Sequence, residues 1–330
     1  MALRRIVVVG CGSIGRRHAR VLKNRANISL ELCEPDPANL SLALDEVGNV
    51  PTYTSFDEML ATKPDMVIIA TPHFLHADQS IAALSAGVHV LCEKPMSDSL
   101  ENAQRMRDVV KGSDAVFSVG FTLHFYPAMK AIKDVIASGD LGTILHVHWH
   151  IGTYITLMNS VSRYQSTTEG ALLLDYVHQP DLLYWWLGKH PTAIFAIGHQ
   201  GGNQALQSNP NVMIMTIEYA DNLVATIHLN YAQHPQRAYC EIIGDKQSLL
   251  YDMMTGEIHT SDYATGTVSI QDFAVNRDDL FVAEHQAFID AVDGKRSPES
   301  PADEAIVSMR IVEAAMASWK YKQRIEINQP

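Results

Sequence analysis

The sequence predicts an α/β domain with a doubly wound parallel sheet, followed by an α+β domain with a large, mostly antiparallel open sheet. Up to about residue 121, strand-like apolar runs alternate with helical segments of roughly ten residues, the pattern of parallel sheets covered by helices. Beyond residue 122, several strand-like runs follow one another and are joined by short turns typical of hairpins. We therefore place the domains at residues 1–121 and 122–330.

The first domain is expected to begin with a strand over Ile6–Val9, because an uninterrupted β-branched run suits burial on both faces of a sheet. A helix should follow over Arg16–Lys23. The later strands of this domain are predicted at 29–33, 65–70, 88–92 and 115–120, and its later helices at 77–86 and 100–111. Ligands of such sheets bind at the carboxyl ends of the strands.

The second domain is expected to open with a helix at 127–137 and a long strand at 143–154. One helix is predicted over residues 170–187. The strand-like runs that follow lie at 193–198, 212–219, 223–231, 238–243 and 248–251, and two helices at 281–292 and 302–321 close the chain.

Composition excludes several classes of function. The 330 residues are 47% hydrophobic and 19% charged, with a net charge of −12, so a nucleic-acid or anionic-membrane partner is not expected. No apolar run approaches the roughly 18 residues of a transmembrane helix. The four cysteines form no CxxC pair, which indicates buried thiols in a reducing compartment and a cytoplasmic protein.

A glycine-rich loop follows the first strand and opens the first helix. Gly10 permits a tight turn, Gly12 lets the backbone approach a pyrophosphate, and Gly15 lets helix and strand pack closely. Ser13 and Ile14 lie between Gly12 and the predicted helix, whose N-terminal amide groups would hold the phosphates. A structural glycine-rich turn is the alternative, but the strand before the loop and the helix after it predict a Rossmann dinucleotide site.

Glu34 ends the second predicted strand, 19 positions after Gly15. A carboxylate there can accept hydrogen bonds from both ribose hydroxyls of the adenosine half, and it would repel a 2′-phosphate. No Arg or Lys occurs at 35–39, so the sequence favours NAD over NADP. Pro35-Asp36-Pro37 is also turn chemistry that would introduce a helix, which is compatible with cofactor binding.

Five further segments complete a resemblance to the glucose–fructose oxidoreductase / inositol dehydrogenase (Gfo/Idh/MocA) family, which extends over nearly the whole chain. They are the Thr71–His76 loop, Glu93-Lys94-Pro95, Gly120-Phe121-Thr122 with Pro127, the Gly170–His178 segment and Ile242–Ser248. The resemblance implies an NAD(P)-dependent dehydrogenase of sugars, polyols or their derivatives. It also implies a cis bond before Pro95.

The chain departs from the family pattern at three places. Many relatives have Asn at the position of His73 and Arg near His124. The catalytic Asp and His are often four positions apart, whereas Asp175 and His178 are three apart. A subgroup with this shorter spacing is common in acidic-sugar and surface-carbohydrate contexts, so the match is suggestive of such a substrate.

Three residues are predicted to carry the chemistry. Oxidation of a secondary alcohol needs a base for the hydroxyl proton and a group that stabilises the developing oxyanion. His178 is the expected base, with Asp175 contacting a substrate hydroxyl or the imidazole and Asp181 supporting it from the next turn. Lys94, at a strand's carboxyl end, is expected to polarise the substrate oxygen. The alternatives are a solvated start of a helix for the Asp/His group and a surface ion pair for Glu93-Lys94.

The remaining expected contacts belong to cofactor and substrate. The predicted cofactor-binding residues beyond the glycine loop and Glu34 are Thr71, Pro72, His76, Glu93 and Lys94. The predicted substrate contacts are Tyr154, Arg163 and Tyr164, together with Lys94, Asp175 and His178.

His146, His148 and His150 alternate along one predicted strand. Such histidines point the same way but lie about 7 Å apart, which is long for a shared zinc ion. We therefore expect no metal site, and a polar sheet face at a subunit interface or on the substrate side.

The leading hypothesis is an NAD-dependent dehydrogenase of a sugar, sugar acid or polyol derivative. Two alternatives remain open: an NAD-retaining glycoside-processing enzyme that oxidises transiently at C3, and a non-catalytic NAD-sensing regulator. The open sheet of the second domain is expected to form a homodimer or homotetramer, because an exposed sheet with apolar faces needs covering.

Overall fold

The computed structural model describes residues 3–159 and 164–327. The chain divides into two compact units: unit 1 is Met1–Phe125 with Asn276–Met309, and unit 2 is Tyr126–Val275 with Arg310–Pro330. The first crossing, at Phe125, lies close to the boundary expected after residue 121. The return of 276–309 to unit 1 has no counterpart in the sequence pattern.

Unit 1 contains a six-stranded sheet whose order is β3-β2-β1-β4-β5-β6, with every neighbouring pair parallel. This confirms the predicted doubly wound α/β domain, because the order reverses between β1 and β4 and creates a crevice at their carboxyl ends. The strands are β1 Arg4–Val9, β2 Ile28–Cys33, β3 Thr52–Tyr53, β4 Met66–Ile69, β5 His89–Glu93 and β6 Phe117–Gly120.

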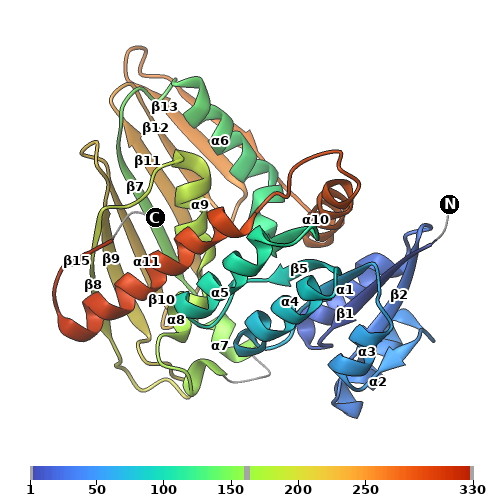
Figure 1. Cartoon of the computed structure of the whole chain (residues 1–330). Helices are drawn as coiled ribbons and strands as arrows, with labels where there is room; N and C mark the ends of the chain where they lie inside the picture. The colour runs from blue at the N-terminus through green and yellow to red at the C-terminus, as the bar shows by residue number, and fades with distance from the viewer. Residues whose placement is uncertain (1–2, 160–163, 328–330) are drawn as a thin grey trace. The chain divides into compact units, whose positions relative to one another are not determined.

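Six α-helices of unit 1 surround this sheet (Figure 1): α1 Ser13–Lys23, α2 Pro37–Val47, α3 Phe56–Ala61, α4 His76–Ser85, α5 Leu100–Lys111 and α10 Arg277–Val292. Two 3₁₀ turns, η1 His73–Leu75 and η2 Thr122–Phe125, join them. Helix α2 begins at Pro37 because the Asp36 side chain accepts a hydrogen bond from the Ala38 N–H at 2.9 Å, which confirms the predicted helix-entry turn.

Helix α10 is part of the core of unit 1 although it lies far along the chain. Its Phe288 is buried in one apolar cluster with Ile6 of β1 and Leu22 of α1. Figure 1 shows α10 beside α1. Phe288 of α10 therefore belongs to the same buried cluster as Cys11 of the glycine-rich loop, which leads into α1.

Unit 2 contains a nine-stranded sheet in the order β14-β13-β12-β11-β7-β10-β9-β8-β15. Only β7 and β10 pair in parallel among its described strands, so the sheet is mostly antiparallel, as predicted. The strands are β7 Ile144–Gly152, β8 Ala193–His199, β9 Val212–Glu218, β10 Val224–Asn230, β11 Arg237–Gly244, β12 Gln247–Asp252, β13 Glu257–Asp262, β14 Val268–Asp272 and β15 Ile325–Glu326.

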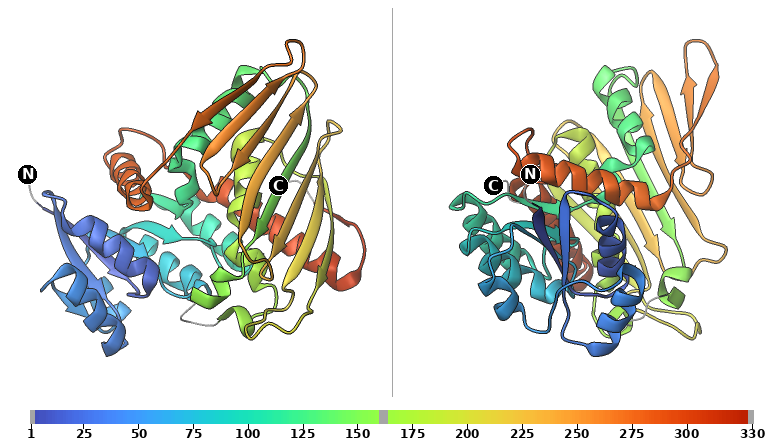
Figure 2. Two further views of the ribbon diagram at one scale, coloured as in Figure 1. Left: turned by 180° about the vertical axis from the view of Figure 1, so that it is seen from behind. Right: turned by 90° about the vertical axis from the view of Figure 1, so that its right-hand side faces the viewer.

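Helices cover one face of this sheet, as Figure 2 shows for α6 Pro127–Ser138 and α9 His178–Leu187. On that face Trp149 of β7 stacks on Trp186 of α9, with ring centroids 5.6 Å apart and planes 11° from parallel. The Trp186 indole donates a hydrogen bond to the Met129 carbonyl of α6 at 3.1 Å. Trp186 is thus a core residue.

The single helix predicted over residues 170–187 is wrong, because the structure has two helices there. Helix α8 spans Ala171–Asp175 and α9 begins at His178. Pro180 explains the break, since it has no N–H for the Tyr176 carbonyl and its ring clashes with that group in a continuous helix. The Tyr176 carbonyl instead accepts a hydrogen bond from the Gln179 N–H at 3.3 Å.

The remaining elements are α7 Ile155–Asn159, η3 Tyr164–Ser166 and α11 Ala302–Tyr321. Within residues 3–159 and 164–327, no helix is long and apolar enough to cross a membrane. The four cysteines are buried and free, as the sequence indicated.

Candidate functional site

The glycine-rich loop has the shape of a dinucleotide cradle. Gly10 has φ +90°, and a Cβ there would lie 2.8 Å from the Ala70 carbonyl oxygen. A Cβ on Gly15 would lie 1.8 Å from the Gly10 oxygen, so only glycine permits this close approach of helix and loop. A Cβ on Gly12 would meet no atom within 4 Å in the described part of the chain. The space above Gly12 suits a pyrophosphate that touches the backbone.

The N-terminus of α1 faces the same loop. Gly12 is its N-cap, and no described side chain caps it. The first N–H with a partner in the helix is that of Arg16, which bonds to the Gly12 carbonyl at 2.9 Å. The amide groups of Ser13 and Ile14 in the first turn, together with the helix dipole, form a site for an anionic group.

Glu34 lies directly after β2, where the sequence predicted it, and is 7% exposed. Its Oε2 accepts a hydrogen bond from the Cys11 N–H at 2.7 Å, and its Oε1 accepts one from the Asp36 N–H at 2.9 Å. The carboxylate is therefore fixed against the glycine-rich loop. Each oxygen keeps a lone pair, so the pair of ribose hydroxyls expected there could still be bound.

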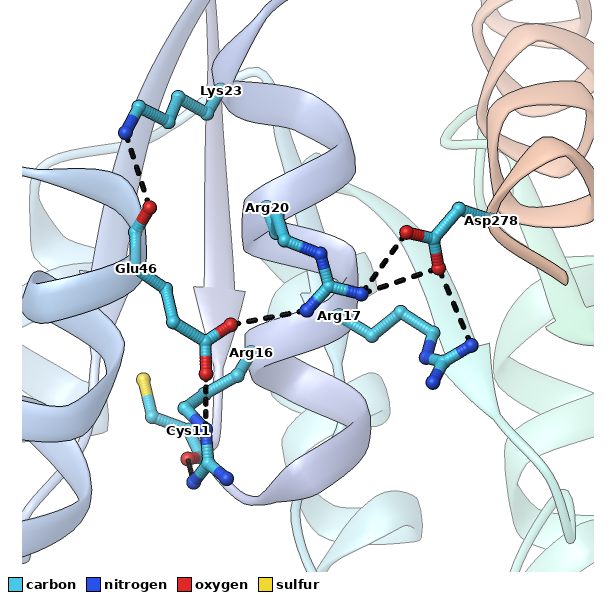
Figure 3. Close-up of polar contacts among 7 residues, drawn as sticks. All are labelled: Cys11, Arg16, Arg17, Arg20, Lys23, Glu46 and Asp278. Atoms are coloured by element: carbon cyan, nitrogen blue, oxygen red, sulfur yellow. Dashed lines mark hydrogen bonds and ion pairs between the residues drawn. The ribbon is translucent and has the colours of Figure 1, made fainter. Parts of the chain in front are cut away.

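Sequence reasoning missed a basic residue on this side of the loop. Arg16 of α1 donates to the Cys11 carbonyl at 3.4 Å and to the Glu46 carboxylate of α2 at 3.0 Å (Figure 3). The argument from sequence considered only residues that follow the second strand, whereas this arginine comes from the helix. Glu46 holds its guanidinium, which reduces the attraction that Arg16 would offer to a 2′-phosphate.

The same charged network ties α1 to its neighbours in unit 1. Arg20 bonds to Glu46 at 3.1 Å and to Asp278 of α10 at 3.1 Å, and Arg17 reaches Asp278 at 3.3 Å (Figure 3). Lys23 donates to the Glu46 carbonyl at 3.1 Å. The helix that carries the phosphate cradle is thus held between α2 and α10.

Glu93 and Lys94 follow one another at the carboxyl end of β5, and the peptide bond between Lys94 and Pro95 is cis, as the resemblance implied. Glu93 is 8% exposed; its Oε1 lies 2.8 Å from His18 Nε2, and its Oε2 accepts a hydrogen bond from the Lys94 N–H at 3.2 Å. Burial by itself would raise the pKa of Glu93. The bond from His18 and the charges of His18 and Lys94 outweigh it, so the pKa lies below its ordinary value.

His76 links the Thr71-Pro72 loop to the loop that contains Lys94. Its Nδ1 lies 2.9 Å from the Pro95 carbonyl and its Nε2 lies 2.9 Å from the Thr71 carbonyl. The ring is 1% exposed, and burial lowers its pKa. Thr71 Oγ1 donates to Gln79 at 2.7 Å. These contacts give His76 a role in holding the Thr71-Pro72 loop, and direct contact with a cofactor stays a prediction.

In unit 2, Asp175 is enclosed by three hydrogen-bond donors. It ends α8, and its carboxylate accepts hydrogen bonds from the Tyr164 hydroxyl, the Tyr231 hydroxyl and, at 3.1 Å, the Gln165 amide. Tyr231 is 1% exposed and Gln165 is 6% exposed. The expected substrate contact Tyr164 is therefore brought to Asp175, whereas Gln165 and Tyr231 were not foreseen. Tyr231, at the end of a predicted strand, gave no signal beyond its residue type.

The two tyrosines around Asp175 are neutral donors. Burial, followed by the negative charge of Asp175, raises the pKa of Tyr164 far above its ordinary value. The same two causes raise that of Tyr231. Neither phenol can therefore ionise near neutral pH, and Tyr164 is a poor candidate for a proton acceptor.

His178 is the first residue of α9, three positions after the end of α8, and Asp181 lies in the first turn of the same helix. Asp181 is 5% exposed. Of the other expected substrate contacts, the Tyr154 hydroxyl accepts a hydrogen bond from the Leu206 N–H at 3.3 Å. Arg163 lies outside the residues that the structure describes.

The three histidines of β7 lie on the sheet face opposite the helices. His146 and His148 both bond to the Thr226 hydroxyl, at 2.9 and 2.8 Å, and His150 bonds to Gln233 at 2.8 Å. Each ring therefore has a protein partner, either Thr226 in β10 or Gln233 in the loop that follows β10.

Two protein-family models match the sequence of this chain. The model described as "Oxidoreductase family, NAD-binding Rossmann fold" (GFO_IDH_MocA) matches residues 4–121. The model described as "Oxidoreductase family, C-terminal alpha/beta domain" matches residues 133–327. Together they cover both sheets.

Individual curated proteins are also similar to this chain in sequence, at identities below 30%. A 2,7-anhydro-N-acetylneuraminate hydratase of Escherichia coli (strain K12) is 28% identical over 252 residues, covering 74% of this chain and 67% of the relative. An inositol 2-dehydrogenase of Salmonella typhimurium is 25% identical over 292 residues, covering 87% of this chain and 82% of the relative. An oxidoreductase from Agrobacterium radiobacter, solved with NAD⁺, L-tartaric acid and magnesium, shares the fold with a TM-score of 0.88 at 17% identity, covering 98% of each chain.

Proposed function

The chain belongs to the Gfo/Idh/MocA oxidoreductase family, and from this premise we propose that it oxidises a secondary alcohol of a sugar, sugar acid or polyol derivative. As a member it is an NAD-dependent oxidoreductase that acts on CH–OH groups. The observation that carries the proposal is the place of Lys94. It follows β5, the strand next to the β1/β4 crevice, on the side away from Glu34. A dinucleotide whose adenosine half lies at Glu34 would extend its nicotinamide toward this side.

In this proposal the side chains divide the work of oxidation. When bound, the nicotinamide supplies the acceptor for the hydride that leaves the carbinol carbon. The Lys94 ammonium donates to the substrate oxygen and stabilises the negative charge that develops on it. His178 accepts the hydroxyl proton as the carbonyl forms. In the reverse direction the same proton returns from His178 to the oxygen.

Asp175 is proposed to orient the reacting groups. Its carboxylate accepts three hydrogen bonds from protein donors, so the direction of its remaining lone pairs is fixed before substrate arrives. Such a pre-oriented acceptor suits a substrate hydroxyl or the imidazole of His178. Tyr154 and Arg163 remain proposed substrate contacts.

A second candidate function is favoured by one comparison. The Escherichia coli relative is named a hydratase, and addition of water involves no net redox change. An enzyme of this kind would retain NAD and oxidise its substrate only transiently, as in the C3 route. A regulator that senses NAD without catalysis would need none of the groups around Lys94 and Asp175.

The test is a screen of sugars, sugar acids and polyols with free NAD, read by the formation of NADH and by chromatography of the substrate. NADH that accumulates with substrate consumption supports the dehydrogenase. Substrate consumption without NADH supports the NAD-retaining enzyme. Binding of NAD with no conversion of any compound supports the regulator. Lys94→Ala should lower the rate of either conversion by about 10²–10⁴-fold, whereas Lys111→Ala, a change at an exposed lysine of α5, should not.

We further propose that the uncovered face of the unit 2 sheet joins copies of this chain. Apolar side chains are exposed on it, with Ile197 at 63%, Ile214 at 49% and Phe195 at 39%. Ile197 and Ile214 are cross-strand partners, and the row continues through His228 to His150. A dimer or tetramer that pairs these faces would cover the row.

Light scattering of the intact protein tests this assembly. Ile197→Lys combined with Ile214→Lys should shift the protein toward monomer at micromolar concentration, because it places charge in the centre of the apolar row. Leu42→Lys, at a residue of α2 that is 49% exposed, is the matched control and should leave the mass unchanged. A monomeric unmodified protein would contradict the proposal.

A further inference from the structure

A buried cluster of ionisable side chains is connected to the backbone of Lys94, and the chemistry proposed above gives it no role. It joins three separate segments of unit 1: His18 of α1, Glu93 of β5, and Glu284 with His285 of α10. All four side chains are nearly inaccessible, with exposures of 0%, 8%, 2% and 2% in that order. Burying this many polar groups costs stability unless they bond to one another.

Hydrogen bonds link three of these side chains, those of His285, His18 and Glu93, to the backbone of Lys94. His285 Nε2 lies 2.7 Å from His18 Nδ1, and His18 Nε2 lies 2.8 Å from Glu93 Oε1. The other oxygen of Glu93 accepts the Lys94 N–H at 3.2 Å. A neutral His285 ring and a His18 ring that donates from Nε2 to the carboxylate satisfy this arrangement.

The surroundings hold His18 and Glu93 in place. The edge of the His18 ring packs against Phe281, with centroids 5.0 Å apart and planes at 78°. Gly120 leaves room for Glu93, because a Cβ there would lie 3.3 Å from Glu93 Oε1. The His18 ring and the Glu93 carboxylate are therefore fixed from several elements, as a supporting group for a functional residue must be.

Glu284 keeps the charge of this cluster on Glu93. In the described part of the chain, neither carboxyl oxygen of Glu284 has a hydrogen-bond partner. Burial, followed by the charge of Glu93, raises the pKa of Glu284 well above its ordinary value, so it is held protonated. Burial lowers the pKa of His285, which keeps that ring neutral.

A metal ion is the competing explanation, since one ligand atom each of His18, Glu284 and His285 lie within 4.8 Å of one another. The spacing of the two imidazoles decides against it. Nitrogens that share a tetrahedral zinc at about 2.0–2.1 Å lie roughly 3.4 Å apart. The observed 2.7 Å is the length of a direct hydrogen bond between the rings.

We infer that His18 and His285 are positioning residues, which fix Glu93 and through it the backbone at Lys94, so that the Lys94 ammonium is directed at the substrate oxygen. This inference rests on the proposed role of Lys94. A lysine side chain has a flexible four-carbon stem, so its direction depends on how firmly its own backbone is held. In this scheme His18 acts through Glu93 on the backbone N–H of Lys94, and it does not contact the substrate.

The first experiment needs no substrate, which separates its outcome from that of the proposed function. Reductive ¹³C-methylation of the intact protein labels its lysines, and the Lys94 resonance is identified by its loss in Lys94→Arg. In His18→Phe, which keeps the ring and removes both nitrogens, the Lys94 resonance should move toward the position of an exposed, mobile lysine. In His18→Gln, whose amide can still donate to Glu93, it should stay near its original position.

Controls distinguish positioning from general loss of structure. His89→Phe changes a half-buried histidine at the other end of β5, whose Nδ1 accepts the Val116 N–H at 2.8 Å, and should leave the Lys94 resonance unchanged. If His18→Phe does not fold, His285→Leu removes the outer link and should shift the resonance in the same direction by less. An unchanged Lys94 resonance in a folded His18→Phe or His285→Leu protein overturns the inference.

Once a substrate is known, turnover gives a second and independent test. His18→Phe should lower kcat by roughly 10²-fold, the loss expected from a small misplacement of a reacting group, with little change in affinity for NAD. In a Lys94→Ala background the same change should alter the residual rate by less than about twofold, because the group that it positions is absent. Equal losses in both backgrounds would indicate a merely structural role and would overturn the inference. So would elemental analysis that finds one bound metal ion per chain, lost in His285→Leu.

Discussion

Each unit contains one buried carboxylate beside a residue proposed to act in catalysis, and the two are held in different ways. Glu93 in unit 1 is bonded to an imidazole and to a backbone N–H. Asp175 in unit 2 is bonded to two phenols and an amide, from Tyr164, Tyr231 and Gln165. An imidazole is thus among the partners of Glu93, whereas the three donors around Asp175 are hydroxyl and amide groups.

This difference separates two ways of fixing a functional group. Tyr164 and Tyr231, whose pKa values are raised by burial, hold Asp175 as neutral hydrogen-bond donors. Around Glu93, burial keeps Glu284 protonated and His285 neutral, so the negative charge of this cluster stays on Glu93. Unit 2 thus supplies a carboxylate held by neutral donors, and unit 1 supplies a lysine whose backbone is held through a charged carboxylate.

The largest expected effect tests whether Lys94 of unit 1 and His178 of unit 2 act in the same reaction. Lys94→Ala and His178→Ala should each lower turnover by about 10²–10⁴-fold, the range of a lost acid–base or charge-stabilising group. Affinity for NAD, measured by titration, should remain nearly the same. Near-normal turnover of His178→Ala on the true substrate would show that the proton acceptor has been misassigned.

The next largest effect tests only the hydrogen bonds that hold Asp175 in unit 2. Tyr231→Phe removes one hydrogen bond to the Asp175 carboxylate, and bonds to charged groups contribute about 1.5–3 kcal/mol, so kcat/KM should fall roughly 10- to 100-fold. Steady-state kinetics should show no change in the shape of the pH profile. Tyr219→Phe is the control, because the Tyr219 hydroxyl is buried without a partner among the described residues. A loss as large in the control would remove the special role of Tyr231.

A third prediction extends the comparison to Glu34, a buried carboxylate bonded to two backbone N–H groups. Glu34→Ser with Glu46→Gln should remove the repulsion of a 2′-phosphate and release Arg16 to bind it. We expect the preference for NAD over NADP, measured as a ratio of Kd values, to narrow by about tenfold or more. Glu46→Gln alone should change little, since Glu34 still repels the phosphate. Equal affinities of the unmodified protein for both cofactors would contradict the role given to Glu34.

The smallest effect concerns the pH dependence of stability. Because the folded-state pKa of Glu284 is raised, its protonated form supports the fold below the unfolded-state pKa, and this support is lost as the pH rises toward the folded-state value. Glu284→Gln cannot ionise, so its Tm relative to that of the unmodified protein should increase between about pH 5 and about pH 8. Calorimetry measures this, with Glu101→Gln at an exposed site of α5 as control. The same difference in Tm at both pH values would show that Glu284 does not titrate in this way.

The parts of the site that the sequence predicted are contiguous along the chain. The Gly10–Gly15 loop, Glu34 and Glu93-Lys94 each directly follow a strand of the parallel sheet, and strand periodicity places such residues at one edge. The edge hairpin β13–β14 was not predicted, although Val268 and Ile270 alternate with polar residues in β14, whose residues are all exposed. The break between α8 and α9 was likewise missed, since Pro180 was a local signal that the helix prediction did not weigh.

By itself, the sequence determined the parallel sheet, the phosphate cradle and the two loops that carry Glu34 and Lys94. Apolar periodicity and glycine positions act over a few residues, so they can be interpreted without knowing the fold. Only the tertiary structure decided that His285 of α10 meets His18, and that Tyr231 reaches Asp175. These contacts join residues 267 and 56 positions apart, and no local preference specifies them. They form because a buried polar group is stable only when the packing of the core brings a hydrogen-bond partner to it.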